Sequence, residues 1–198
     1  MRGADLLAWL ATLSPDVRER AVDDHLGIGG PPPFAVEPPG EHLLGYHPSG
    51  VDPIIQVCTE VPLTPNDVVV DLGSGLGKVV FLAHLLTGAK ARGIELQPPL
   101  VERAQAAAQR LGVDVSFTCA DVRDAELGDG NVFFLYAPFT GPVLAQVLQR
   151  LRAVAERKSI VVCALAIDLH HDAPWLVARP LDAFWLTIYD SRALRDGC

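Results

Sequence analysis

The sequence has few cysteines, and they are far apart. Its 198 residues include only Cys58, Cys119, Cys163 and Cys198, and no two of these form a C-x-x-C pair. Zinc sites and disulfide frameworks depend on closer or more numerous cysteines, so the spacing favours reduced thiols in a cytoplasmic protein and predicts no metal site. We expect Cys58, Cys119 and Cys163 to be core residues, because each lies in an apolar segment.

Long apolar runs and clusters of basic residues are also absent. No apolar run reaches the roughly 18 residues that a membrane-spanning helix needs, and the chain does not open with a signal peptide. The net charge is −8. Phosphate binding relies on clustered lysines and arginines, so the sequence argues against nucleic acid as a partner, and it predicts no membrane association.

The remaining composition is that of a globular protein, with 49% apolar and 20% charged residues. Its length suits one domain with a small additional element. Residues 1–26 are predicted to form a helical extension, since residues 5–13 have an apolar face and Ser14-Pro15 is a typical helix start. Residues 27–45 are rich in glycine and proline and predict a linker, and residues 46–198 form the main domain.

The most informative segment is residues 68–78, with the sequence V-V-V-D-L-G-S-G-L-G-K. Three valines predict a strand buried on both faces, as in a parallel sheet, and the apolar residues after Lys78 predict a helix. A strand, a glycine turn and a helix place backbone N–H groups against a ligand, and glycines allow that ligand to approach the main chain.

The details of this loop narrow the choice of ligand. Its glycines have the spacing G-x-G-x-G, whereas a dinucleotide fingerprint has G-x-G-x-x-G. Asp71 would repel a phosphate and suits a cationic or amine-bearing ligand. A phosphate-binding P-loop is excluded because Val79, and not serine or threonine, follows Lys78.

Asp71-Leu-Gly-Ser-Gly-Leu-Gly closely resembles the first motif of class I S-adenosylmethionine-dependent methyltransferases. The cofactor of that family carries an α-amino group and a sulfonium. The resemblance implies an α/β, Rossmann-like class I methyltransferase fold, with a mostly parallel seven-stranded sheet. It also implies a C-terminal antiparallel hairpin, which residues 175–180 and 183–189 are expected to form.

Other site residues follow the ends of predicted strands. Glu95 ends the strand over residues 91–95, where an acidic residue can bind both ribose hydroxyls of either S-adenosylmethionine or NAD. The resemblance implies that Asp121 and Val122 bind adenine and that the loop before the motif covers the methionine end. The predicted cofactor-binding residues are Tyr46, Ser49, Asp71, Gly73, Ser74, Gly75, Gly77, Glu95, Leu96, Asp121, Val122 and Tyr136.

The acceptor is expected at the end of the strand over residues 131–136. Amino-methyltransferases often carry Asn, Asp or Ser here, followed by Pro-Pro and an aromatic residue. Pro138-Phe139 matches the end of that motif, but Tyr136-Ala137 supplies no amide or carboxylate, so a nitrogen acceptor is not implied. We assign substrate positioning to Tyr136, through its hydroxyl, and to Phe139, through its ring.

Histidines are the candidates for a general base, which is needed only if the acceptor arrives protonated. They are His47, in the loop before the motif, and His170 and His171, which we expect in an exposed loop. The two adjacent histidines are poor co-ligands for a metal, and the sequence offers no third ligand beside them.

The leading hypothesis is an S-adenosylmethionine-dependent methyltransferase that acts on a small molecule or a protein side chain. The alternatives are a non-catalytic S-adenosylmethionine-binding module and, third, an NAD-dependent oxidoreductase. Residues 71–78, together with the preceding predicted helix over residues 49–61, and residues 132–141 also resemble the non-SET histone lysine methyltransferases and their small bacterial relatives. Those enzymes use basic extensions to hold nucleosomes, and this acidic chain has none. The sequence leaves the oligomeric state open.

Overall fold

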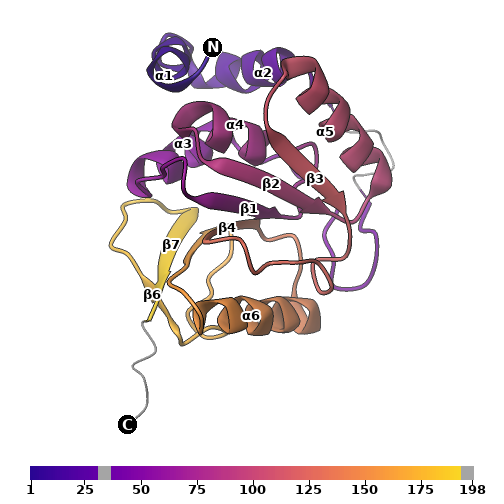
Figure 1. Cartoon of the computed structure of the whole chain (residues 1–198), viewed down its shortest axis with the longest axis vertical. Coiled ribbons are helices and arrows are strands. Elements are labelled where there is room, and N and C mark those ends of the chain that lie inside the picture. Colours follow the sequence, from indigo (N-terminus) through magenta and orange to yellow (C-terminus); the bar gives the residue numbers. More distant parts are fainter. Residues whose placement is uncertain (31–36, 193–198) are drawn as a thin grey trace.

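The computed structural model describes residues 1–30 and 37–192 (Figure 1). Its helices are α1 (Gly3–Ala11), α2 (Pro15–Leu26), α3 (Val51–Glu60), α4 (Lys78–Thr87), α5 (Pro98–Leu111) and α6 (Gly141–Ala155). Its strands are β1 (Val68–Leu72), β2 (Lys90–Glu95), β3 (Val115–Cys119), β4 (Val132–Tyr136), β5 (Val161–Leu165), β6 (Leu176–Ala178) and β7 (Leu186–Ser191).

The strands form one sheet in the order β3-β2-β1-β4-β5-β7-β6. The strands β1 to β5 pair in parallel, whereas β7 lies antiparallel between β5 and β6. This topology confirms the predicted Rossmann-like methyltransferase fold and its C-terminal antiparallel pair. The connection between β6 and β7 spans residues 179–185, so it is longer than the short turn that we expected.

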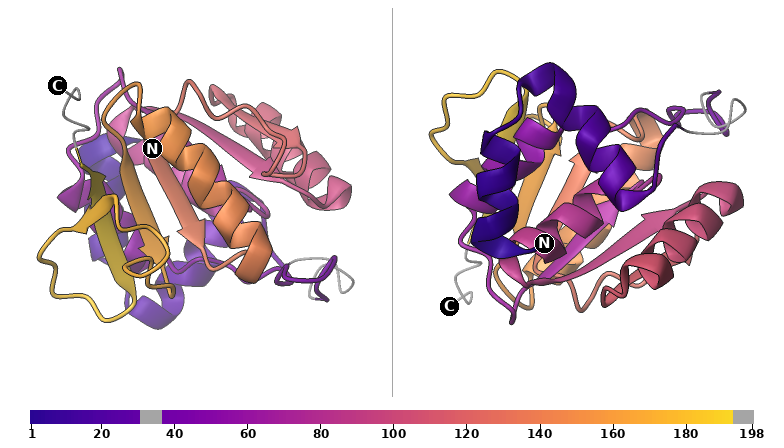
Figure 2. Two further views of the ribbon diagram at one scale, coloured as in Figure 1. Left: turned by 90° about the horizontal axis from the view of Figure 1, so that it is seen from below. Right: turned by 90° about the horizontal axis from the view of Figure 1, so that it is seen from above.

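Helices cover both faces of the sheet, with α3, α4 and α5 on one side and α6 on the other (Figures 1 and 2). Neighbouring residues of β1 face opposite sides, as a strand requires. Val69 belongs to the core under α4, and Val70 belongs to the core under α6. The run of valines therefore reflects burial on both faces.

The N-terminal helices pack onto the domain as an outer layer over α3 and α4 (Figure 2, right). Leu6 and Leu10 of α1 and Val22 and Leu26 of α2 are buried in the same core as α4. Residues 3–11 and 15–26 are thus helical, as the sequence predicts for this segment. The predicted linker includes residues 31–36, which lie outside the described residues, and the three-part division of the chain stays a prediction.

The start of α3 has no cap from its own side chains. Ser49 is of a residue type that often caps helices, but Gly50 occupies the N-cap position and makes no side-chain cap. Glu19 of α2 takes the place of a local cap, because its Oε1 accepts a hydrogen bond from the Val51 N–H at 2.5 Å. The acceptor therefore comes from a distant segment of the chain.

The cysteine predictions are partly wrong. Cys163 is buried and Cys58 is half-buried, but Cys119 is exposed because it ends β3, an edge strand. Burial raises the pKa of the Cys163 thiol to about 12, which disfavours its reactive thiolate. Cys198 lies outside the described residues. Within residues 1–30 and 37–192, no helix is long and apolar enough to cross a membrane.

We expect Phe133→Ala to destabilise the protein by about 3–5 kcal/mol, because it removes a fully buried ring from β4 and leaves a cavity. The matched control is Phe184→Ala, since Phe184 is fully exposed and its loss should change the free energy of unfolding by less than about 0.5 kcal/mol. Urea unfolding measures both. Equal effects in the two variants would contradict the described core.

Candidate functional site

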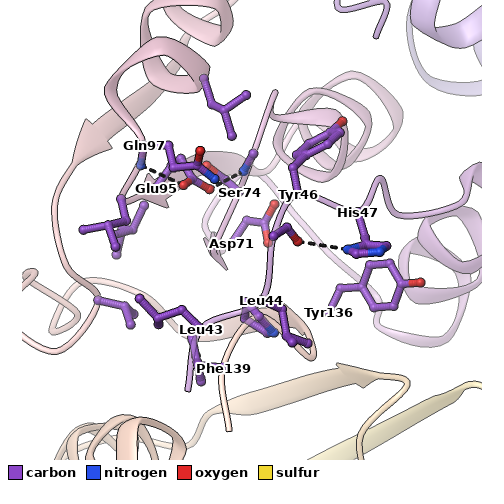
Figure 3. A pocket seen from close by; sticks show the side chains of 18 of the residues that line it. Leu43, Leu44, Tyr46, His47, Asp71, Ser74, Glu95, Gln97, Tyr136 and Phe139 are labelled. Carbon is purple, nitrogen blue, oxygen red and sulfur yellow. Dashed lines mark hydrogen bonds between the residues drawn. The ribbon is translucent and has the colours of Figure 1, made fainter. Parts of the chain in front are cut away.

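A pocket of about 240 Å³ lies at the carboxyl ends of β1, β2 and β4 (Figure 3). Among the described residues that line it are nearly all of those that the sequence predicts for the site. They are Tyr46, Ser49, Asp71, Gly73, Ser74, Gly75, Glu95, Leu96, Asp121, Val122, Tyr136 and Phe139. Ligands of open α/β sheets bind at this edge, outside the carboxyl ends of the strands.

The loop after β1 depends on its glycines. Gly73 and Gly75 have φ angles of 85° and 53°, which side chains rarely adopt. A Cβ on Gly73 would lie 2.7 Å from the Cβ of Pro138, and one on Gly75 would overlap the ring of Tyr46. The main chain therefore approaches two other walls of the pocket closely.

Gly77 has a different position from the one expected. It does not line the pocket, but forms the N-cap of α4 with a φ angle of 85°. A Cβ there would overlap the ring of Phe117 on β3. The structure therefore gives Gly77 a role in packing the loop onto the sheet rather than in lining the pocket.

Asp71 is the most unusual group of the site. Its side chain is only 4% exposed, and within the described residues its carboxylate accepts no hydrogen bond. Burial, and then the nearby charge of Glu95, raise the pKa of Asp71 well above its ordinary value. Burying a carboxylate without a partner is costly, so this position favours a cationic ligand or a proton.

A second polar atom of the loop is also left without a partner. The Oγ of Ser74 is buried and has no hydrogen-bond partner among the described residues. Gly93 leaves room for this side chain, since a Cβ at that position would overlap it. The glycine loop thus presents unsatisfied polar groups at the pocket, as a site for a polar ligand does.

Glu95 is held in place by backbone donors. Its Oε2 accepts from the Gly75 N–H at 2.8 Å, and its Oε1 accepts from the Gln97 N–H at 2.9 Å. A carboxylate has about four lone-pair positions, so each oxygen can still accept from a ligand hydroxyl. The side chain is positioned for a diol and at the same time fixes the glycine loop.

Asp121 lies after β3 at another wall of the pocket. Its Oδ2 accepts from Arg123 Nη2 at 2.6 Å, and its Oδ1 accepts from the Arg123 backbone N–H at 2.8 Å. The hydrogen bonds from Arg123 lower the pKa of this carboxyl. Asp121 therefore remains an ionised acceptor, and Val122 beside it is buried.

The loop after β4 forms the opposite wall and contains a strained residue. Ala137 has a φ angle of 37°, in the left-handed region that non-glycine residues avoid. An antiparallel bridge joins Leu43 to Phe139, and the Leu44 N–H donates to the Pro138 carbonyl at 3.0 Å. The sequence analysis missed this pairing, since two leucines in a glycine- and proline-rich segment give no signal of their partner.

One histidine candidate lies at the pocket. His47 and Tyr136 both line the pocket (Figure 3), and the Nδ1 of His47 is 2.9 Å from the carbonyl oxygen of Gly45. This contact assigns the proton to Nδ1 and leaves Nε2 as an acceptor in the neutral ring. His170 and His171 lie in an exposed loop after β5, as predicted, and do not line the pocket.

Lys78 also lines the pocket, although the sequence analysis gave it no role. It is the first residue of α4, and its side chain is only 5% exposed. No motif could have identified it, because its partners come from α2. Among the described residues, no cluster of three or more metal-binding side chains is present.

The raised pKa of Asp71 predicts a pH dependence of stability. A raised folded-state pKa gives stability that is present below the unfolded pKa of about 4 and is lost as the pH rises through the folded value. We therefore expect Asp71→Asn to gain stability relative to the wild type between pH 5 and pH 8, as measured by urea unfolding.

The control for this experiment has the opposite sign. Arg92 lowers the pKa of Asp129, so Asp129→Asn should lose stability relative to the wild type at pH 8. That loss should shrink as the pH falls below about 4, toward the lowered pKa of Asp129. If Asp71→Asn also lost stability at pH 8 relative to the wild type, as Asp129→Asn should, the description of Asp71 as a buried carboxylate without a donor would be contradicted.

Solved structures and curated relatives resemble this chain. A Salinibacter ruber RNA methyltransferase, crystallised with S-adenosyl-L-homocysteine, aligns with a TM-score of 0.59 and 27% identity over 73% of this chain and 92% of its own. A Bdellovibrio bacteriovorus protein named an uncharacterized RNA methyltransferase is 31% identical over 118 residues, 58% of this chain and 30% of its own length.

An uncharacterized protein of Methanocaldococcus jannaschii is 39% identical over 61 residues, which are 31% of this chain and 28% of that protein. This chain thus matches less than a third of the length of either curated relative. A family model described as a methyltransferase domain matches residues 69–171, more than half of the chain. The chain therefore belongs to the methyltransferase domain family.

Proposed function

We propose that this methyltransferase transfers the methyl group of S-adenosylmethionine to a small molecule or a protein side chain. Asp71 and the loop from Gly73 to Gly75 would hold the methionine part of the cofactor, Glu95 the ribose, and Asp121 with Val122 the adenine. The family assignment and the Salinibacter ruber complex support the choice of cofactor.

The buried Asp71 carboxylate is the observation that carries this proposal. It is desolvated, has no donor in the described part of the chain, and faces a pocket. S-adenosylmethionine brings an ammonium group and a sulfonium, and either cation would relieve the cost of burying that charge. The pyrophosphate of NAD would increase the cost, which argues against the oxidoreductase alternative.

The other two carboxylates match the remaining parts of the cofactor. Each oxygen of Glu95 accepts one backbone N–H and can still accept a ribose hydroxyl. Asp121 is kept ionised by Arg123 and can accept from the amino group of adenine. Glu95 ends β2 and Asp121 follows β3, so the pairing of these parallel strands sets the distance between the two side chains.

The protein's task is mainly alignment. The bound cofactor supplies an electrophilic methyl group on its sulfonium, and no further activation of that group is required. Residues of the pocket hold the reacting groups in line and keep out water, which lowers the entropic part of the barrier. His47 can accept a proton at Nε2 where the acceptor arrives protonated, because Gly45 fixes its tautomer.

The acceptor side supports a small or slender group. Leu43, Leu44, Pro138 and Phe139 give this side of the pocket an apolar lining. Tyr136 contributes a hydroxyl that can orient the acceptor, and Phe139 contributes a ring.

RNA is the competing acceptor, since two of the matched proteins carry RNA methyltransferase in their names. The net charge of −8 argues against a long nucleic-acid groove. A non-catalytic cofactor-binding module is the other alternative, and the lack of an amide or carboxylate at Tyr136-Ala137 is its support.

The first experiment is isothermal titration with S-adenosylhomocysteine, run beside NAD. We expect micromolar binding of S-adenosylhomocysteine, no binding of NAD, and a loss of at least roughly tenfold in affinity for the Asp71→Ala, Glu95→Ala variant. Circular dichroism of the variant controls for its folding. A folded wild-type protein that binds NAD but not S-adenosylhomocysteine would overturn the cofactor assignment.

The second experiment identifies the class of acceptor. The protein is incubated with methyl-labelled S-adenosylmethionine and a cell extract divided into small molecules, proteins and RNA. We expect label in the small-molecule or protein fraction, and the Asp71→Ala, Glu95→Ala variant gives the background. Label only in RNA would replace the proposed acceptor, and binding without transfer to any fraction would favour the non-catalytic module.

A further inference from the structure

Lys78 is a buried cation at the edge of the acidic pocket. It follows the glycine loop directly and begins α4. Its Nζ lies 3.0 Å from Glu19 Oε2 and 2.8 Å from Asp23 Oδ1, and both carboxylates belong to α2. Among the described residues that line the pocket, Lys78 alone is a lysine or an arginine.

Contacts with three other helices fix the position of α2. Glu19 Oε1 accepts from the first N–H of α3, so one carboxylate joins α2, α3 and α4. Arg18 pairs with Asp52 of α3, and Arg110 of α5 donates to the carbonyl of Leu26. The carboxylates that hold Lys78 are therefore placed by the fold, before any ligand binds.

The charge pattern of this region matches a zwitterion. Asp71 and Glu95 bring two carboxyl groups to the pocket, whereas Lys78, directly after the glycine loop, brings an ammonium. An ammonium has three donors, so Lys78 can serve both carboxylates and one further acceptor. The amino-acid end of S-adenosylmethionine has an ammonium, which suits Asp71, and a carboxylate, which needs a cation.

Asp23, the second α2 carboxylate that pairs with Lys78, also lies near the pocket. Tyr46 covers Gly75, and its pKa is raised by burial and then by the charge of Asp23. Asp23 is thus close enough to influence a residue of the pocket wall. The charges of Glu19, Asp23 and Lys78 therefore act on the same pocket that the glycine loop lines.

We infer that Lys78, positioned by Glu19 and Asp23, binds the α-carboxylate of the cofactor's amino-acid end, so that the N-terminal helix α2 is part of the cofactor site. This inference rests on the proposed seating of S-adenosylmethionine. A role limited to docking α2 is the competing explanation, because the same ion pairs also join the helix to α4.

A pair of ligands separates the two explanations. S-adenosylhomocysteine carries the carboxylate, and its decarboxylated counterpart keeps the amine and the thioether but lacks that group. We expect the wild-type protein to bind S-adenosylhomocysteine more tightly, by on the order of tenfold or more, as for a hydrogen bond between charged groups. Isothermal titration of both ligands gives this ratio without any variant.

Variants then test whether Lys78 causes the difference in affinity between the two ligands. Lys78→Met should bring the ratio close to one, and Lys78→Arg should retain most of it because the charge is kept. Lys90→Met is the matched control, since Lys90 is an exposed lysine at the start of β2, the end of that strand remote from the pocket. Circular dichroism and thermal unfolding confirm that each variant is folded.

Each outcome decides between the explanations. A wild-type ratio near one overturns the inference, whether or not Lys78→Met folds. Equal losses of affinity for both ligands in Lys78→Met assign Lys78 to docking alone. If Lys78→Met does not fold, Lys78→Gln is used, and an unchanged ratio in that variant overturns the inference. A wild-type protein that binds neither ligand contradicts the proposed function instead.

Discussion

A carboxylate without a donor at the end of the central strand is the constraint on which the site depends. The N–H groups of Gly73 and Ser74, which follow Asp71 closely in the chain, both donate to the carbonyl of Ile94, at 2.9 and 3.0 Å. The turn is therefore bonded to β2 rather than to the carboxylate. Asp71 is left for a ligand, and the free protein bears the cost of burying it.

The parallel sheet converts this local arrangement into a pocket. β1 lies between β2 and β4, so the chain segments that follow three neighbouring strands meet at one edge. Glu95 connects two of them, because it accepts from Gly75 across the β1–β2 boundary. Burial raises the pKa of Asp71, and the charge of the Glu95 carboxylate raises it further, so this one side chain affects both the shape and the charge of the site. Changes at Glu95 should therefore disturb both.

Sequence reasoning succeeded where the signal is local, and where the same position recurs at the carboxyl ends of neighbouring parallel strands. Asp71 and Glu95 lie at the carboxyl ends of strands that the pattern of apolar residues identifies, and Asp121 follows the next such strand. Parallel strands bring such positions together. It failed where a partner comes from a distant segment. Ser49 is a reasonable cap by sequence, but Glu19, more than thirty residues away, bonds the first N–H of α3 instead. Cys119 was misplaced because an apolar segment does not reveal that its strand lies at an edge.

The site also extends beyond the segment that identifies the family. Residues 69–171 include the glycine loop and Lys78, but not α2, which holds that lysine. Buried ion pairs add little net stability, because the cost of desolvation offsets the attraction between the charges. Two carboxylates on one buried lysine are therefore a poor way to dock a helix that already buries Val22 and Leu26. They instead hold the Lys78 ammonium in one position beside the acidic pocket, where a ligand carboxylate can pair with it.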